Sequence, residues 1–196
     1  MEISTFRGRN DLDALRHNNA VDASPATASE LPAMADLARR AVPGLTIADA
    51  AVERVFRHDP ECIFPFRSAG RILGGIAFLH LNEDGLVRLL LDEISFSDPR
   101  VELLARPGER PAAIYVWALA ARGRASAGIG NVSVRLRREP YARADYYAQP
   151  SSSDGKRLLG RLGFERTASF QPDLWLYRRR VSTVLADPAL TLRKVA

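Results

Sequence analysis

Apolar residues in the first third of the chain recur at spacings that predict two helices. Thr27 and Glu30 form a capping box in front of the first helix, and Pro43-Gly44 ends it. A second helix is expected from a cap at Thr46 to Asp59-Pro60, because proline disfavours helical backbone in the residue before it. The first helix depends on five apolar residues at helical spacing: Leu31, Met34, Leu37, Ala38 and Ala41.

The middle of the chain has the composition of strands. Cys62–Arg67 is rich in Ile and Phe, and Arg71–Leu81 is long enough to cross a sheet. Gly74-Gly75 inside the second run indicates a bulge or a close approach by another part of the backbone. Asn82–Gly85 predicts a turn, and Leu86–Leu91 is expected to form a further strand.

The second half begins with a run that is apolar on both faces, Ile114–Ala121, which predicts a central strand. A last strand is predicted over Asp173–Arg178. Between them we expect four elements in order: a loop over Arg122–Gly128, a helix over Ile129–Arg138, a strand over Asp145–Gln149 and a helix over Asp154–Leu162.

The predicted loop after the central strand has the features of an anion site. Its small residues let backbone N–H groups approach a ligand, and the next helix directs its unpaired N–H groups and positive dipole end at the same place. Arg122 and Arg124 add full positive charge, so a pyrophosphate would fit. Similar turns also occur as tight connections that bind no ligand.

Composition indicates one globular domain. The chain has 196 residues, of which 46% are hydrophobic and 26% are charged. We expect an N-terminal extension over 1–19, a single domain over 20–180 and a C-terminal tail over 181–196. The lone Cys62 excludes an internal disulfide and a Cys-based zinc site, and three scattered histidines make no metal site.

The chain has no window as long as a membrane span, and its acidic start is unlike a secretion signal, so we expect a cytoplasmic protein. The net charge of +5 indicates acidic partners. Nucleic-acid binding would depend on this charge alone, because no groove-reading or base-stacking element is recognisable. We therefore expect neither a membrane nor a nucleic acid as a partner.

From Arg122 to Phe164 the chain resembles the GNAT acetyltransferase superfamily. The motif of that family is Arg or Gln, two residues, Gly, one residue, then Gly or Ala. Arg122–Ala127 corresponds to it, with Ala125 at the central Gly. Leu158–Phe164 is similar to the family's Leu-Tyr-x-x-Leu-Gly-Phe, with Leu159 in place of the Tyr that often protonates the CoA thiolate. Ser153 stands where the family usually has Asn.

The resemblance implies an α/β (α+β) fold of GNAT type, with a mixed, mostly antiparallel sheet of about six to seven strands flanked by about four helices. It also implies that the loop amides bind the pyrophosphate of acetyl-CoA, or of another acyl-CoA, and that the preceding strand runs beside pantetheine. The cofactor-binding residues expected on this basis are Trp117, Ala118, Leu119, Arg122, Gly123, Arg124, Ala125, Ser126, Ala127 and Ser153.

The implied reaction is direct attack by an amine of unknown identity on the thioester carbonyl in a ternary complex. Glu93, then Asp92, is the expected base, since partial burial after an apolar run would raise a carboxylate's pKa. A solvated turn carboxylate is the alternative for both. Tyr147 and Tyr146 are the expected acids, on opposite faces of their strand, and Tyr115 is a further candidate.

Several alternatives stay open at this point. The irregular segment 92–111 either shapes the acceptor site or is a solvated connection. Leu159 and Ala125 also fit a catalytically inactive GNAT-like module that binds CoA or a partner. His80 is expected to be a partly buried strand residue with a hydrogen-bond partner. A homodimer through the last strand and tail is a further expectation.

Overall fold

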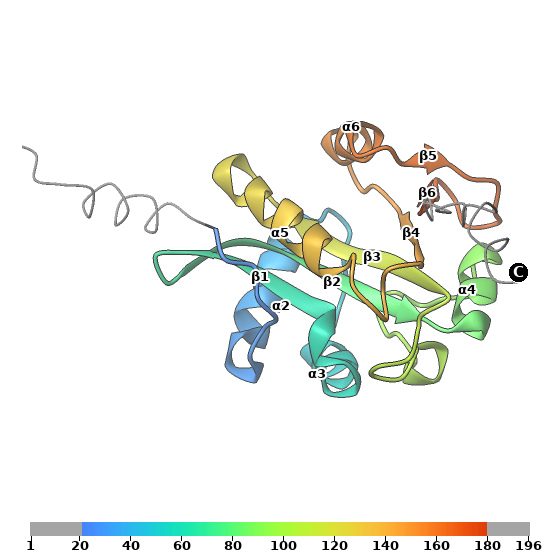
Figure 1. Cartoon of the computed structure of the whole chain (residues 1–196), viewed down its shortest axis with the longest axis horizontal. Coiled ribbons are helices and arrows are strands. Elements are labelled where there is room, and N and C mark those ends of the chain that lie inside the picture. Colours follow the sequence, from blue (N-terminus) through green and yellow to red (C-terminus); the bar gives the residue numbers. More distant parts are fainter. Residues whose placement is uncertain (1–20, 180–196) are drawn as a thin grey trace, which may run out of the picture.

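The computed structural model describes residues 21–179, which form a six-stranded sheet in the order β1-β2-β3-β4-β6-β5 (Figure 1). All neighbouring strands are antiparallel except β3 and β4, which are parallel. The predicted mixed, mostly antiparallel sheet is therefore confirmed. The strands are β1 (Ile63–Ser68), β2 (Arg71–Leu81), β3 (Ala113–Ala120), β4 (Asp145–Ala148), β5 (Glu165–Arg166) and β6 (Trp175–Tyr177).

Helices cover both faces of the sheet. The α-helices are α2 (Leu31–Ala41), α3 (Asp49–His58), α4 (Glu83–Leu90), α5 (Ala127–Arg135) and α6 (Ser153–Arg161). Short 3₁₀ helices are η1 (Ala28–Glu30), η2 (Pro60–Cys62), η3 (Val101–Leu103) and η4 (Gly123–Ser126). No helix in this part of the chain is long and apolar enough to cross a membrane.

Strand alternation divides the core into two apolar clusters. Leu79 and Tyr115 point to the face that carries α2, α3 and α4, where Trp117 also packs. Phe78 and Ile114 point to the opposite face, which is covered by α5 (Figure 1). β3 contributes to both clusters, so its prediction as a central strand is confirmed.

One predicted strand is a helix. Residues 86–91, expected to be extended, lie largely in α4. The Asn82 side-chain oxygen accepts a hydrogen bond from Gly85 N at 2.8 Å and caps this helix. Gly85 also packs so closely on the Leu103 carbonyl that a Cβ would lie 2.2 Å from its oxygen. The apolar run was too short for its period to distinguish the two structures.

Two predicted helix starts were also wrong. The second helix begins at Asp49 rather than after Thr46. The Arg39 guanidinium donates hydrogen bonds to the Ile47 carbonyl at 3.2 Å and to the Asp49 carboxylate at 2.7 Å, which hold the backbone between them extended. The helix after the central strand begins with η4 at Gly123 and ends at Arg135. The predicted extension and tail lie outside the described residues.

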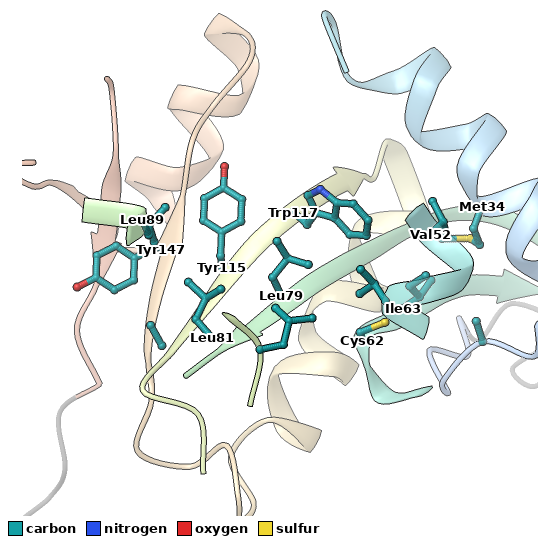
Figure 2. Close-up of a cluster of buried hydrophobic side chains, with 14 of the residues drawn as sticks. Met34, Val52, Cys62, Ile63, Leu79, Leu81, Leu89, Tyr115, Trp117 and Tyr147 are labelled. Atoms are coloured by element: carbon teal, nitrogen blue, oxygen red, sulfur yellow. The ribbon is translucent and has the colours of Figure 1, made fainter. Parts of the chain in front are cut away.

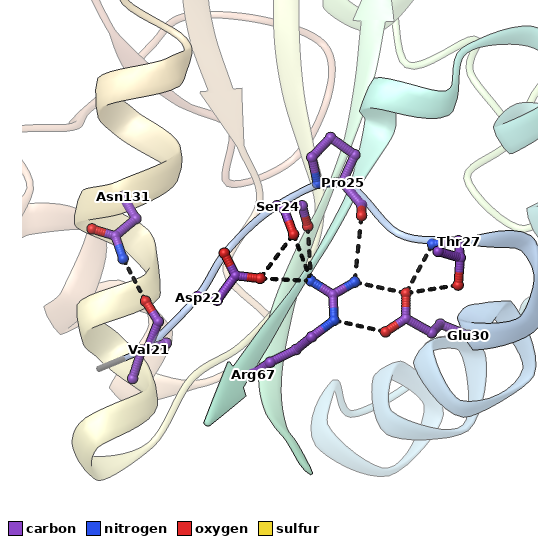
Figure 3. Close-up of polar contacts among 8 residues, drawn as sticks. All are labelled: Val21, Asp22, Ser24, Pro25, Thr27, Glu30, Arg67 and Asn131. Carbon is purple, nitrogen blue, oxygen red and sulfur yellow. Dashed lines mark hydrogen bonds and ion pairs between the residues drawn. The ribbon is translucent and has the colours of Figure 1, made fainter. Parts of the chain in front are cut away.

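Arg67 on β1 fastens the N-terminal segment to the sheet (Figure 3). Its guanidinium donates to both Glu30 carboxylate oxygens, at 2.7 and 2.6 Å, and to the Ser24 and Pro25 carbonyls. Glu30 accepts from Thr27 N at 2.8 Å, so the predicted capping interaction is confirmed and shared with Arg67. The hydrogen bond from Arg67 lowers the pKa of Glu30 to about 2.

The Arg67→Ala substitution should lower the free energy of unfolding by about 3 kcal/mol, because it leaves a largely buried carboxylate and two carbonyls without their donor. Chemical denaturation measures the effect. Arg71→Ala, at the exposed start of β2, is the control and should change stability by less than about 0.5 kcal/mol. Equal effects of the two substitutions would contradict this role for Arg67.

Candidate functional site

The parallel pairing of β3 with β4 ends halfway along β3. The register runs from Ala113 opposite Asp145 to Val116 opposite Ala148, where β4 ends. β3 continues to Ala120, and the two strands diverge (Figure 1). Residues 117–120 therefore present an edge that no strand pairs with, among the described residues, on the side away from β2. Backbone polar groups on such an edge require other partners.

A β-bulge lies at the point of divergence. The β2–β3 register passes from Ala77 opposite Ala118 to Phe78 opposite Val116, so Trp117 has no opposing residue. Bulges bend a strand and occur frequently beside active sites. The indole N–H of Trp117 donates to the Phe96 carbonyl at 2.9 Å, which ties the segment after α4 to this bulge.

β3 leads directly into the predicted anion loop. The predicted loop, residues 122–128, consists of η4 and the first residues of α5, so the unpaired N–H groups at the start of both helices lie within it. Gly123 adopts a positive φ of 55°, and a Cβ at this position would meet nothing within 4 Å. Ser126 Oγ donates to the Gly123 carbonyl at 2.7 Å and tightens the turn. Arg122 and Arg124 are exposed on its outside.

The inner side of this loop is packed against the sheet. Ala125 is 2% exposed, and its Cβ lies 3.2 Å from where a Cβ of Gly74 would stand. A Cβ on Gly128 would lie 2.3 Å from the Phe66 ring. Ala125 is not among the residues with positive φ, so alanine fits the position where the motif has glycine. The predicted close approach at Gly74 is also confirmed.

The two candidate tyrosines of β4 lie on opposite faces of the sheet, as strand alternation predicts. Tyr147 is in the same apolar cluster as Tyr115 and Trp117 (Figure 2). Its hydroxyl makes no hydrogen bond within residues 21–179, and burial raises its pKa. Tyr146 lies on the other face, where its hydroxyl accepts from Arg179 at 3.4 Å.

The expected burial of Glu93 was wrong. Its side chain is 49% exposed and pairs with Arg88 at 2.9 Å, because it follows a surface helix and not an apolar strand. Asp92 is exposed and has a φ of 60°. Glu93 nevertheless borders a cavity of about 260 Å³ between segment 93–104 and the end of β2. Part of the irregular segment 92–111, which was expected to shape the acceptor site, thus lines a cavity.

Two residues of the predicted motif, Ser153 and Leu159, lie in α6. Ser153 is the exposed first residue of the helix, and Ser152 caps it by accepting from Gly155 N at 3.1 Å. Leu159, which stands where the resembled family has tyrosine, is buried. This position therefore offers an apolar packing group and no acid. No cluster of three metal-ligating side chains occurs in the described part of the chain.

His80 and Asp59 form a buried hydrogen-bonded pair, of which only His80 was identified from the sequence. His80 has the expected partner: its Nδ1 donates to Asp59 Oδ2 at 2.5 Å. Burial is the largest single influence and would raise the pKa of Asp59, but the hydrogen bond and charge of His80, together with the Glu61 N–H and the charge of His58, lower it. The sequence marked Asp59 only as the end of a helix. His80 Nε2 is buried without a hydrogen-bond partner among residues 21–179.

No family model matches the chain, and a search of curated proteins finds no match. Among solved structures, the loading GNATL domain of CurA from Lyngbya majuscula superposes with a TM-score of 0.60 at 12% identity, covering 81% of this chain and 98% of that one. The GphF GNAT-like decarboxylase, solved in complex with isobutyryl-CoA, gives 0.51 at 17% identity and 71% of each chain. The GNAT fold predicted from the sequence is confirmed.

Two glycines of α5 test whether the helix must lie this close to the sheet. Gly128→Ala should cost about 1–3 kcal/mol of stability, because its methyl group collides with Phe66. Gly130→Ala meets nothing within 4 Å and should stabilise the protein by up to about 1 kcal/mol through helix propensity. Thermal unfolding compares the variants. A change in stability of the same sign for both substitutions would contradict the placement of α5.

Proposed function

We propose that this GNAT-fold protein is an acyltransferase that moves a short acyl group from acyl-CoA to an amine acceptor. The observation that carries the proposal is the continuity of the unpaired edge of β3, residues 117–120, with the anion loop 122–127. An extended ligand with an anionic end would bind along both. Acyl-CoA has these features in the required order.

In this proposal the pyrophosphate lies on the N–H groups that begin at Gly123, with Arg122 and Arg124 supplying charge. The two amides of pantetheine bond the free edge of β3 as a partner strand would. The thioester then lies beside the bulge, where an N–H of Trp117 or Ala118 polarises its carbonyl. The isobutyryl-CoA complex of the similarly folded GphF decarboxylase supports an acyl-CoA donor.

The proposed reaction has no covalent enzyme intermediate. The acceptor amine attacks the thioester carbonyl carbon, a C–N bond forms and the C–S bond breaks. A base takes one proton from the amine, and CoA leaves as a thiolate that receives a proton. The products are an amide and free CoA. Glu93 remains the proposed base, acting through water because its side chain is exposed and paired with Arg88.

Tyr147 is the better candidate for the acid. It shares a face of the sheet with Trp117, and its hydroxyl, whose pKa is raised by burial, carries a proton to donate at neutral pH. Tyr146 is directed to the opposite cluster and is engaged by Arg179. Figure 2 shows Tyr115 between Tyr147 and Trp117 on this face of the sheet.

A second candidate function is a catalytically inactive module that binds CoA or a protein partner. Leu159 favours it, because the position at which the resembled family supplies an acid is a buried leucine. The two functions share the donor site and differ in turnover. CoA binding without acyl transfer to any tested amine would favour the inactive module.

Coenzyme A should stabilise the protein in thermal unfolding, since a ligand that binds only the folded state adds about 2.7 kcal/mol to the free energy of unfolding at a hundredfold excess over its Kd.

Arg122→Glu should weaken CoA binding at least about tenfold in calorimetry, because it reverses a charge on the anion loop. Arg57→Glu, on the exposed side of α3, changes the net charge equally and should leave affinity unchanged. Equal losses in both variants would remove the loop from the site.

Tyr147→Phe should lower kcat about 100-fold and leave the Kd for acetyl-CoA unchanged, because it removes a proton donor and not a binding contact. Thiol release with a panel of amines provides the assay. Tyr146→Phe is the matched control on the opposite face and should retain activity. The assignment fails if the Tyr146 variant loses activity and the Tyr147 variant does not.

A further inference from the structure

An apolar cavity of about 40 Å³ lies over the unpaired half of β3, on the face that carries α2 and α3. Trp117, Ala118 and Ala120 line it, so three of the four residues on the free edge of β3 also border the cavity. A group held at this edge would therefore lie next to the cavity. The larger cavity beside Glu93 has a separate lining.

Small residues on two neighbouring strands create this space. Gly75 and Ala77 of β2 lie beside Ala118 and Ala120 of β3, and all four border the cavity. Farther along the same face, β2 carries large leucine side chains that fill the core. The sheet thus has a shallow apolar floor only next to the bulge, where the thioester is proposed to lie.

The walls come from the helical layer. The Met34 methyl group lies 2.3 Å from where a Cβ of Gly75 would stand, so this flexible side chain rests on the glycine. Ala38 of α2 and Leu45 and Ile47 of the following connection complete the walls and are only partly buried. None of the lining residues is charged. A charged amine would lose its hydration there without compensation.

We infer that this cavity receives the hydrocarbon chain of the acyl group, and that the donor carries about three to five acyl carbons rather than acetyl. The inference depends on the proposed function, because the thioester must lie at Trp117 and Ala118 for its chain to enter. About 10–15 Å³ admits one water-sized group, so a cavity of 40 Å³ admits a short straight or branched chain.

The test measures the affinity of the full chain for CoA, acetyl-CoA, propionyl-CoA, butyryl-CoA, isobutyryl-CoA and hexanoyl-CoA by calorimetry. Affinity should rise about fourfold with each added carbon from acetyl to butyryl or isobutyryl, as expected for burial of one methylene group. It should then level off, because the cavity is filled. Binding is measured without an acceptor, so the unknown amine does not enter the experiment.

Two substitutions address the cavity itself. Ala38→Leu should fill it from α2 and abolish the gain from acetyl-CoA to butyryl-CoA, while CoA affinity stays the same. Leu45→Ala should enlarge it and move the preference to hexanoyl-CoA. Ala50→Leu adds the same side chain on the exposed side of α3 and should change neither the affinity for CoA nor the gain in affinity from acetyl-CoA to butyryl-CoA. Thermal unfolding without ligand establishes that each variant is folded.

The outcomes separate this inference from the proposed function. Equal affinity for acetyl-CoA and all longer compounds would overturn the inference alone and leave the acyl-CoA site standing. Failure of every CoA compound to bind would overturn both. A chain-length preference that persists unchanged in folded Ala38→Leu would place the acyl chain elsewhere and would also overturn the inference.

Discussion

The structure depends on one interruption in its hydrogen bonding: β3 and β4 pair for four residues and then separate. A parallel pair that continued to Ala120 would satisfy the backbone of both strands and leave no edge for a ligand. The bulge at Trp117 bends β3 at the place where pairing stops. The free edge follows from this divergence, and the predicted anion loop and the apolar cavity lie directly beside that edge.

The two faces of the sheet differ in how closely they are packed beside the point where β3 and β4 separate. On one face, Gly74 and Gly128 let Ala125 and α5 lie directly on β1 and β2, which fixes the direction of the helix N-terminus. On the other face, small residues of β2 and β3 leave space that Met34 only partly fills. The same strand is therefore closely packed on the face of α5 and borders a cavity on the face of α2. Arg67 secures the helical layer that covers this second face.

Local signals predicted β3 and the capping interaction of Thr27 with Glu30, because an apolar run and capping residues act over a few positions. The GNAT fold was expected from the resemblance of Arg122–Phe164 to that family. Local signals failed where distant segments decide the structure. Residues 86–90 lie in α4, where Gly85 packs on the Leu103 carbonyl of η3, and Glu93, which follows this helix, is exposed. The cavity joins α2 to β3 through residues such as Ala38 and Ala118, whose spacing in the chain carries no signal.

Amide hydrogen exchange with and without saturating CoA tests the central claim most directly, because it reports on the free strand edge itself. The account predicts slower exchange confined to residues 117–127, where pantetheine and pyrophosphate would occupy backbone groups of β3 and the anion loop. The contradicting result is protection in other segments, with exchange over 117–127 unchanged in the presence of bound CoA. In that case the divergence of β3 and β4 would not be the donor site.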